Sequence, residues 1–245
     1  MEYQRKISEV LCMYKIEPEL RDVYVEGITD KLVLDRYFKK YNLFDVSIKN
    51  VGDIDFSEIY ESFPNIKRNN KKKLIALSDS IEGLYGDTLK GLSIIVDRDF
   101  DEIKGGMVNG FYTEYSDYNS IELYLFNENV IDIFYKNFNR NFPFSAQKTI
   151  QEISPALVEK FLIRLVVDIK GPFPRDKIVD ISKSLSINKS NGEVVFDSKV
   201  HLMKILNNLG LSNMEDEFSS EIERCRKLLS KELKNNIRGH DFMHL

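Results

Sequence analysis

The fold of this chain is decided by residues 93–101, SIIVDRDFD, where an apolar run ends in a carboxylate at every second position. Runs of isoleucine and valine are typical of strands that are buried on both faces of a parallel sheet. Ligands of such sheets bind outside the carboxyl ends of the strands. The stretch therefore predicts a central strand that carries an acidic cluster to one edge of an α/β sheet.

The three aspartates of this stretch predict a site for a divalent metal ion. Carboxylates so close together cannot all stay ionised cheaply unless a cation compensates their charge. Hard oxygen ligands select Mg²⁺, Mn²⁺ or Ca²⁺ rather than zinc. We therefore expect Asp97, Asp99 and Asp101 to bind Mg²⁺, or Mn²⁺ in its place. The structural alternative is a helix cap or turn with solvated charge, which is the usual role of single aspartates after strands.

A second stretch has the same pattern of a strand followed by a carboxylate. Residues 23–25, VYV, precede Glu26 and Gly27, and the pair Thr-Asp at 29–30 opens a helical pattern. Glycine allows a sharp turn of the backbone, and a threonine or aspartate can cap a helix that begins at Lys31. We expect Glu26 to lie at a strand end, as the three aspartates do.

Together, the two stretches resemble the TOPRIM domain shared by topoisomerases, primases and OLD-type nucleases. The resemblance rests on Val-Glu-Gly at 25–27 with Asp30 and Leu34 downstream, and on Asp-Arg-Asp at 97–99 after the apolar strand. It covers about the first half of the chain. It implies a Rossmann-like α/β domain with a mainly parallel sheet.

The resemblance also implies roles for the acidic residues. In that family, the glutamate after the first strand acts as general acid or base or contacts metal, and the paired aspartates hold Mg²⁺. Glu26, Asp97 and Asp99 are thus implied as catalytic and metal-binding residues, and Asp101 as a further metal ligand that some members have. Glu122 is a further catalytic candidate, because the resemblance places an acidic residue there. A glutamate in the first turn of a helix is otherwise a surface residue favoured by the helix dipole.

A finer resemblance is to small bacterial TOPRIM proteins, related to OLD nucleases, that are encoded beside ABC-type or AAA-type ATPases. The group includes the effector nuclease of the PARIS antiphage system. Supporting motifs are Tyr-Thr at 112–113, Asn-Ser-Ile-Glu at 119–122 and Ile-Arg-Gly-His-Asp at 237–241. The resemblance implies a toxic endonuclease of abortive infection that an ABC-type ATPase restrains and then releases, and that forms a homodimer once released. It implies cleavage of tRNA, with DNA as the alternative substrate.

The composition limits the partners of this chain. Its 245 residues are 42% hydrophobic and 30% charged, with a formal net charge of -4. This balance excludes a uniformly basic nucleic-acid binder, although it allows a basic patch. The sequence contains no P-loop pattern, so we expect any dependence on ATP to come from the partner protein.

The chain is long enough for one large domain or two modest ones. We expect the nuclease domain at 1–130, with an N-terminal helix from Ile7 to Tyr14 before its first strand. Further strands are expected at 46–51 and 110–113, and a helix from Asp53 or Asp55. We expect a mainly helical accessory or partner-binding domain at 131–245. Its long helical patterns lie at 131–138, 149–170 and 217–234, and its extended segment lies at 194–196.

The most basic segment leads into an apolar helical pattern after residue 74. We predict that its side chains guide a polyanion toward the acidic site. A solvated helix start is the alternative, because runs of charge usually serve solubility. The residues are Lys67, Arg68, Lys71, Lys72 and Lys73.

The cysteines and the apolar runs predict a cytoplasmic protein. Cys12 and Cys225 lie far apart and match no metal-ligand spacing, which favours reduced thiols. No secretory leader pattern and no uncharged run of about 20 residues is present, so we expect neither export nor a membrane span.

Rival motifs account for the acids less well. An EF-hand needs glycine where Glu102 stands and a bidentate glutamate where Val108 stands, so that interpretation fails. A haloacid-dehalogenase phosphatase expects threonine or valine in place of Phe100 and leaves Glu26 unexplained. A DxD sugar-nucleotide site also leaves Glu26 unexplained. The alternative of another class is a partner-binding module with this fold but without catalysis, whose acids contact a basic surface.

Overall fold

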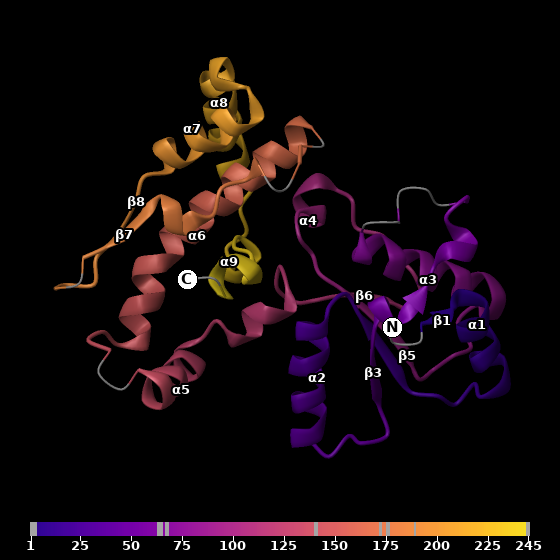
Figure 1. Ribbon diagram of the computed structural model, residues 1–245. Helices are drawn as coiled ribbons and strands as arrows, with labels where there is room; N and C mark the ends of the chain where they lie inside the picture. Colours follow the sequence, from indigo (N-terminus) through magenta and orange to yellow (C-terminus); the bar gives the residue numbers. More distant parts are fainter. Residues whose placement is uncertain are drawn as a thin grey trace. The chain divides into compact units, whose positions relative to one another are not determined.

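The chain forms two compact units in the computed structural model, Met1–Ile121 and Glu122–Leu245 (Figure 1). The division after Ile121 falls earlier than the predicted boundary after residue 130. The structure describes residues 4–62, 66, 69–139, 142–171, 173–174, 177–188 and 190–243.

A parallel sheet forms the centre of the first unit. Its strand order is β3-β2-β5-β6, and each neighbouring pair is parallel. The strands are β2 (Asp22–Val25), β3 (Ser47–Asn50), β5 (Leu92–Val96) and β6 (Thr113–Tyr115). The predicted α/β class with a mainly parallel sheet is confirmed, and the apolar run before Asp97 is an inner strand as predicted.

The strand order places a topological switch point between β2 and β5. From β2 the chain first adds β3 on one side, and then crosses over to add β5 on the other side. In open α/β sheets the crevice for ligands lies at this point, outside the carboxyl ends of the two strands. Glu26 follows β2 and Asp97 follows β5, so both residues lie at the switch point.

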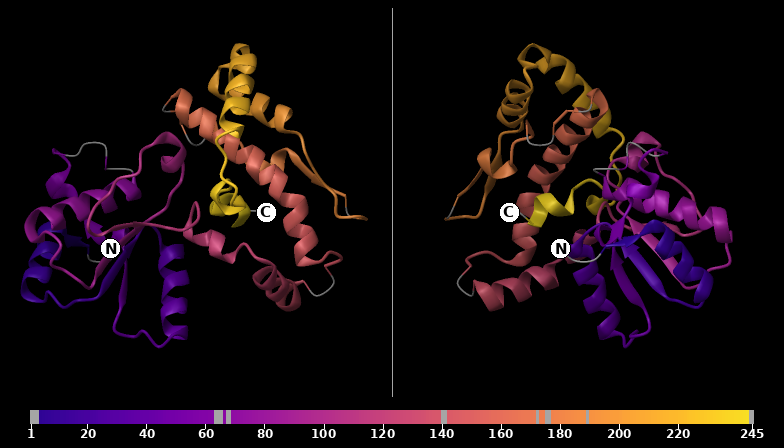
Figure 2. Two further views of the ribbon diagram at one scale, coloured as in Figure 1. Left: turned by 180° about the vertical axis from the view of Figure 1, so that it is seen from behind. Right: turned by 45° about the vertical axis from the view of Figure 1, so that its right-hand side comes forward.

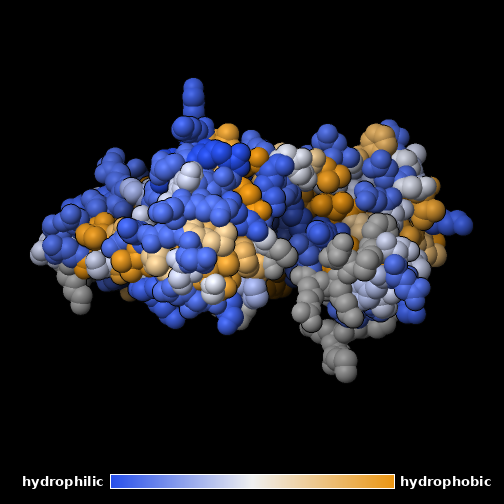
Figure 3. All heavy atoms as spheres, turned by 90° about the horizontal axis from the view of Figure 1, so that it is seen from above, coloured by the Kyte–Doolittle hydropathy of each residue, from blue (hydrophilic) through white to orange (hydrophobic). Residues whose placement is uncertain are grey.

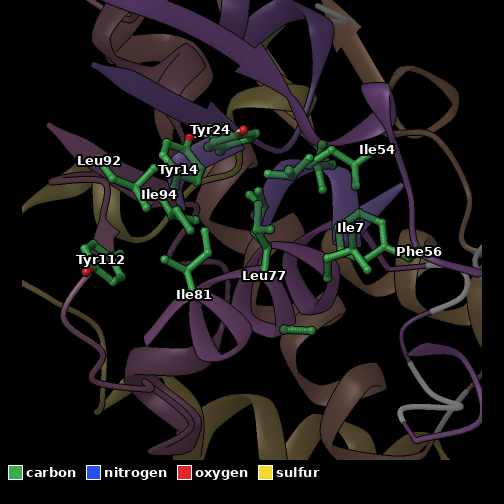
Figure 4. Close-up of a cluster of buried hydrophobic side chains, with 14 of the residues drawn as sticks. Ile7, Tyr14, Tyr24, Ile54, Phe56, Leu77, Ile81, Leu92, Ile94 and Tyr112 are labelled. Carbon is green, nitrogen blue, oxygen red and sulfur yellow. Dashed lines mark hydrogen bonds between the residues drawn. The ribbon is translucent and has the colours of Figure 1, made fainter. Parts of the chain in front are cut away.

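Helices cover both faces of this sheet (Figures 1 and 2). Helix α2 (Ile28–Lys40) packs Val33 and Leu34 against Val23 and Val25 on one face. Helices α1 (Ile7–Ile16) and α3 (Asn70–Tyr85) cover the other face. Burial of both faces explains why the inner strands are almost wholly apolar. The core on the α1 and α3 side includes Ile7, Tyr14, Tyr24, Leu77, Ile81 and Ile94 (Figure 4).

Several elements of the first unit differ from the predictions. Helix α2 begins at Ile28 rather than Lys31, because Asp30 in its first turn reaches back and accepts the N–H of Gly27 at 2.9 Å. Strand β6 begins at Thr113, where the strand predicted at 110–113 ends. In place of the helix expected from Asp53 or Asp55, the chain forms the 3-10 turns Val51–Asp53 and Ser57–Ile59 and the two-residue strand β4 (Ile54–Asp55). Strand β4 pairs in parallel with β1 (Arg5–Lys6). Helix α4 (Asp101–Lys104) follows β5.

The second unit consists of helices and one antiparallel hairpin. Its elements are α5 (Glu128–Phe138), α6 (Ala146–Lys170), β7 (Leu185–Ile187), β8 (Val194–Phe196), α7 (Ser198–Leu209), α8 (Glu215–Arg226) and α9 (Gly239–Met243). Further 3-10 turns are Ile121–Leu125, Ile181–Lys183, Ser212–Met214 and Leu233–Asn235. The long helix predicted at 149–170 is confirmed as α6, and the one predicted at 217–234 ends at Arg226. Helix α7 and strand β7 were not predicted.

In the described part of the chain, no helix combines the length and the apolar character that crossing a membrane requires. Hydrophilic side chains are interspersed with apolar ones on the face drawn in Figure 3.

Candidate functional site

Glu26 and Asp97 meet at the switch point of the sheet. The backbone N–H of Asp97 donates to Glu26 Oε1 at 3.0 Å, which joins the ends of β2 and β5 directly. The side-chain amide of Asn70, in the first turn of α3, donates to the carbonyl oxygen of Glu26 at 2.9 Å. These two hydrogen bonds hold Glu26 at the switch point between β2 and β5.

The environment of Glu26 favours its protonated form. Burial is the main cause that raises its pKa, to about 7, and the charges of Asp99 and Asp30 act in the same direction. The hydrogen bond from Asp97 N–H and the charge of Lys71 oppose the shift. A carboxyl group whose pKa lies near neutral pH is suited to exchange a proton during a reaction.

The loop after β5 is held from two sides. Asp97 Oδ1 accepts the N–H of Ile121 at 3.2 Å, and the N–H of Asp99 donates to the carbonyl oxygen of the buried Asn119 at 3.1 Å. Asp99 has a φ of 49°, a left-handed conformation that costs free energy in a residue with a side chain. Such backbone conformations persist where the surroundings impose them, and they cluster at functional sites.

Lys71 lies among the carboxylates. Its Nζ is 2.7 Å from Asp101 Oδ2 and 3.8 Å from Asp99 Oδ2, and it donates to the carbonyl oxygen of Asp97. The Lys71 side chain is only 10% exposed. The sequence prediction grouped Lys71 with an exposed basic guide, whereas the first turn of α3 directs this residue to the sheet edge.

The other predicted nucleic-acid-binding residues have different positions. Lys72 is exposed, and Lys73 is partly buried with its Nζ 5.7 Å from the ring centre of Phe56. Lys67 and Arg68 lie outside the described residues. Among the described lysines of this segment, Lys72 is thus the one that matches the predicted exposed guide.

The structure brings four of the predicted acidic site residues together in the first unit. Glu26 and Asp97 are hydrogen-bonded, while Asp99 and Asp101, at the start of α4, are near Lys71. Glu122 is the first residue of the second unit and directly follows Ile121, whose N–H donates to Asp97 Oδ1. The catalytic role of Glu122 stays a prediction.

Within the described ranges, no three His, Cys, Asp or Glu side chains are arranged to hold a metal ion. The position of Lys71 accounts for this, because it faces Asp101 and Asp99. The donor chemistry still fits Mg²⁺, since this ion is usually bound by one or two carboxylates and keeps several waters. Glu26 and Asp97, which follow neighbouring strands, are the two carboxylates that could supply these ligands.

A second buried polar cluster, in the second unit, was not predicted. Lys160 Nζ of α6 lies 2.8 Å from Asp241 Oδ1 of α9, and Arg164 Nη2 lies 3.1 Å from the same oxygen. Burial lowers the pKa of Lys160, and burial lowers that of the nearby His201 to about 4. The cluster anchors the Arg-Gly-His-Asp segment through its aspartate. A lysine within the apolar pattern of α6 was the sequence signal for it.

Comparison with known proteins gives no family for this chain. No protein-family model matches it, and no curated protein sequence matches it. The TOPRIM resemblance therefore stays a hypothesis that rests on the motif residues themselves.

Proposed function

We propose that this chain is a phosphodiesterase that uses Mg²⁺ or Mn²⁺, and specifically an endonuclease. The observation that carries the proposal is the pairing of Glu26 and Asp97 at the switch point of a parallel sheet, where α/β proteins bind their ligands. Carboxylates at the carboxyl ends of neighbouring strands, one of them with a pKa raised to about 7, are groups suited to metal-assisted hydrolysis of a phosphodiester.

In this proposal, Glu26 and Asp97 would hold the ion, while Asp99 lies beside Lys71. The ion, when bound, supplies a positive charge that polarises the scissile phosphate. Burial raises the pKa of Glu26 to about 7 in the metal-free chain, and a bound ion would lower it. Glu26 would then be ionised and able to accept the proton of the attacking water. The N–H groups of Asp97 and Ile121 keep the two carboxylates oriented, since each donates to one of them.

The substrate and the partner are proposed from the resemblance. It favours RNA, with tRNA before DNA, and an ABC-type ATPase that restrains a toxic effector until phage infection. A homodimer of the released effector and a cytoplasmic location belong to the same proposal. The exposed Lys72 supports contact with a polyanion close to the site.

The test is cleavage of total tRNA by the purified chain with Mn²⁺ or Mg²⁺. We expect Glu26→Gln and Asp97→Asn each to reduce cleavage at least about 100-fold, which corresponds to about 2.7 kcal/mol of transition-state stabilisation. Glu19→Gln and Asp87→Asn are matched controls, because both residues are exposed and lie away from the site. EDTA should abolish cleavage by the parent chain. Cleavage at the parent rate by both site variants would contradict the proposal.

A partner-binding module without catalysis is the second candidate, and the position of Lys71 favours it. A cluster whose charge is already partly neutralised by a buried lysine needs no metal ion to be stable. Calorimetric titration with Mn²⁺ separates the two candidates. Absence of binding by the parent chain, together with intact tRNA, would support the module.

A further inference from the structure

Lys71 contacts the acidic loop after β5 in the way that a bound cation would. Its Nζ donates to the carbonyl oxygens of Asp97 and Arg98, the latter at 3.2 Å. It also lies 2.7 Å from Asp101 Oδ2 and 3.8 Å from Asp99 Oδ2. Two carbonyl oxygens with carboxylates around one positive charge resemble the oxygen ligands of a metal ion more than a surface ion pair.

Burial gives these contacts more weight than an exposed lysine pair has. Exposed pairs contribute little to stability, whereas charges shielded from water interact more strongly. The side chain of Lys71 is 10% exposed, and the ring centre of Tyr115 is 5.3 Å from its Nζ. Its contacts also bracket Asp99, whose left-handed backbone needs support from its surroundings. Lys71 thus stabilises the conformation of the loop after β5 and also compensates the negative charge of Asp99 and Asp101.

We propose that Lys71 is the resident cation of this site and limits it to one divalent ion. The ammonium neutralises the side of the cluster formed by Asp99 and Asp101, which leaves Glu26 and Asp97 to the metal. A second divalent ion would need the same carboxylate oxygens and would be repelled by the ammonium. The inference rests on the proposed function, because it assumes that the site binds a metal ion.

The first experiment counts Mn²⁺ ions per chain by calorimetry and by electron paramagnetic resonance of free Mn²⁺. We expect one ion for the parent chain and two for Lys71→Met, because methionine keeps most of the side-chain volume and removes the charge. Lys72→Met is the matched control. It removes the same charge from the next residue of the same helix, but this side chain is exposed, so we expect one ion.

The second experiment uses the unaltered chain and does not depend on the folding of a variant. Acetic anhydride labels accessible uncharged lysine amines, and mass spectrometry gives the rate at each lysine. We expect Lys71 to react at least about fivefold more slowly than Lys72, because its side chain is only 10% exposed and the reagent must reach the amine. The proposal requires this protection to persist with Mn²⁺ bound. A rise of the Lys71 rate to that of Lys72 on Mn²⁺ addition would show that the ion displaces the lysine, and would overturn it.

The ion counts distinguish failure of this inference from failure of the proposed function. Two ions on the parent chain, or one on folded Lys71→Met, would overturn the role of Lys71 and leave a metal-dependent nuclease in place. No Mn²⁺ binding by the parent chain would contradict both proposals.

Discussion

The Glu26 carboxyl group is buried, which disfavours its ionised form, and its Oε1 accepts a hydrogen bond from the N–H of Asp97. The carboxyl group has a pKa near 7 in the folded chain because burial disfavours its ionised form, against an ordinary value of 4.5. Between these two pH values the folded state binds more protons than the unfolded state, so the free energy of unfolding falls as pH rises. Well above pH 7, Glu26 is ionised in both states, so its contribution to the free energy of unfolding no longer changes with pH.

We therefore expect Glu26→Gln, measured without metal, to be more stable than the parent chain at pH 8. The amide is neutral at every pH, and its oxygen can still accept the N–H of Asp97. The difference in free energy of unfolding between variant and parent should be about 1–3 kcal/mol larger at pH 8 than at pH 4.5. Urea denaturation at both pH values measures it, with the exposed Glu19→Gln as control. Equal differences at the two pH values would mean that Glu26 is not held in its protonated form.

The sequence was sufficient to identify residues that follow a strand but not the residue that approaches them from a helix. Glu26 and Asp97 were predicted because a carboxylate directly after an apolar run must lie at the strand end. The burial of Lys71 could not be predicted, because residue type does not distinguish it from the adjacent Lys72 and Lys73. Its burial depends on where the first turn of α3 lies above the sheet, which is set by tertiary packing. The left-handed backbone of Asp99 likewise depends on contacts that are distant in sequence.

At the scale of elements, strands with a strong apolar pattern were predicted and those stabilised by pairing alone were not. Strand β5 is apolar except for Ser93 and was predicted, whereas the two-residue β1 and β4 exist through their mutual pairing. The predicted start of helix α2 lies after the observed one because Gly27 has no side chain that could cap the helix. Asp30 caps it instead, from inside the first turn. The local sequence pattern therefore predicts which main helices and strands form more reliably than it predicts their first and last residues.

The attachment of α9 to α6 leads to a prediction at this scale. Asp241→Asn would remove the carboxylate charge 2.8 Å from Lys160 Nζ and 3.1 Å from Arg164 Nη2, in a buried site where the Lys160 side chain is 2% exposed. Removal of one partner of a buried pair costs about 3–5 kcal/mol, so we expect a loss of this size in the free energy of unfolding. Lys160→Met should cost less, because Arg164 still pairs with the aspartate.

Urea denaturation of the two variants measures this difference. Glu217→Gln is the control, since it breaks the ion pair with Lys170 in which the carboxylate is 52% exposed, and it should change stability by at most about 1 kcal/mol. If Asp241→Asn costs no more than this control, the buried cluster does not anchor α9.

At the scale of the whole chain, each unit has its own buried interior, and the proposed metal site lies within the first. A ligand that binds only the folded state stabilises it by RT ln(1 + L/Kd), where L is the concentration of free ligand, so the effect grows with that concentration. Mn²⁺ bound by Glu26 and Asp97 should therefore slow amide hydrogen exchange in the first unit, most at β5 and at Asp97 and Ile121, whose N–H groups bond to these carboxylates. Asp241→Asn should instead accelerate exchange in α6 and α9.

Hydrogen exchange followed by mass spectrometry, on parent and Asp241→Asn chains with and without Mn²⁺, tests both expectations in one set of samples. Because the aspartate variant leaves Glu26 and Asp97 intact, the protection of β5 by Mn²⁺ should be the same in both chains. Glu26→Gln should lose this protection, since an amide cannot neutralise a cation, while exchange in α6 and α9 stays at the parent rate. Protection by Mn²⁺ that appears in α6 and not in β5 would place the metal site in the second unit, and the assignment to the switch point of the sheet would be wrong.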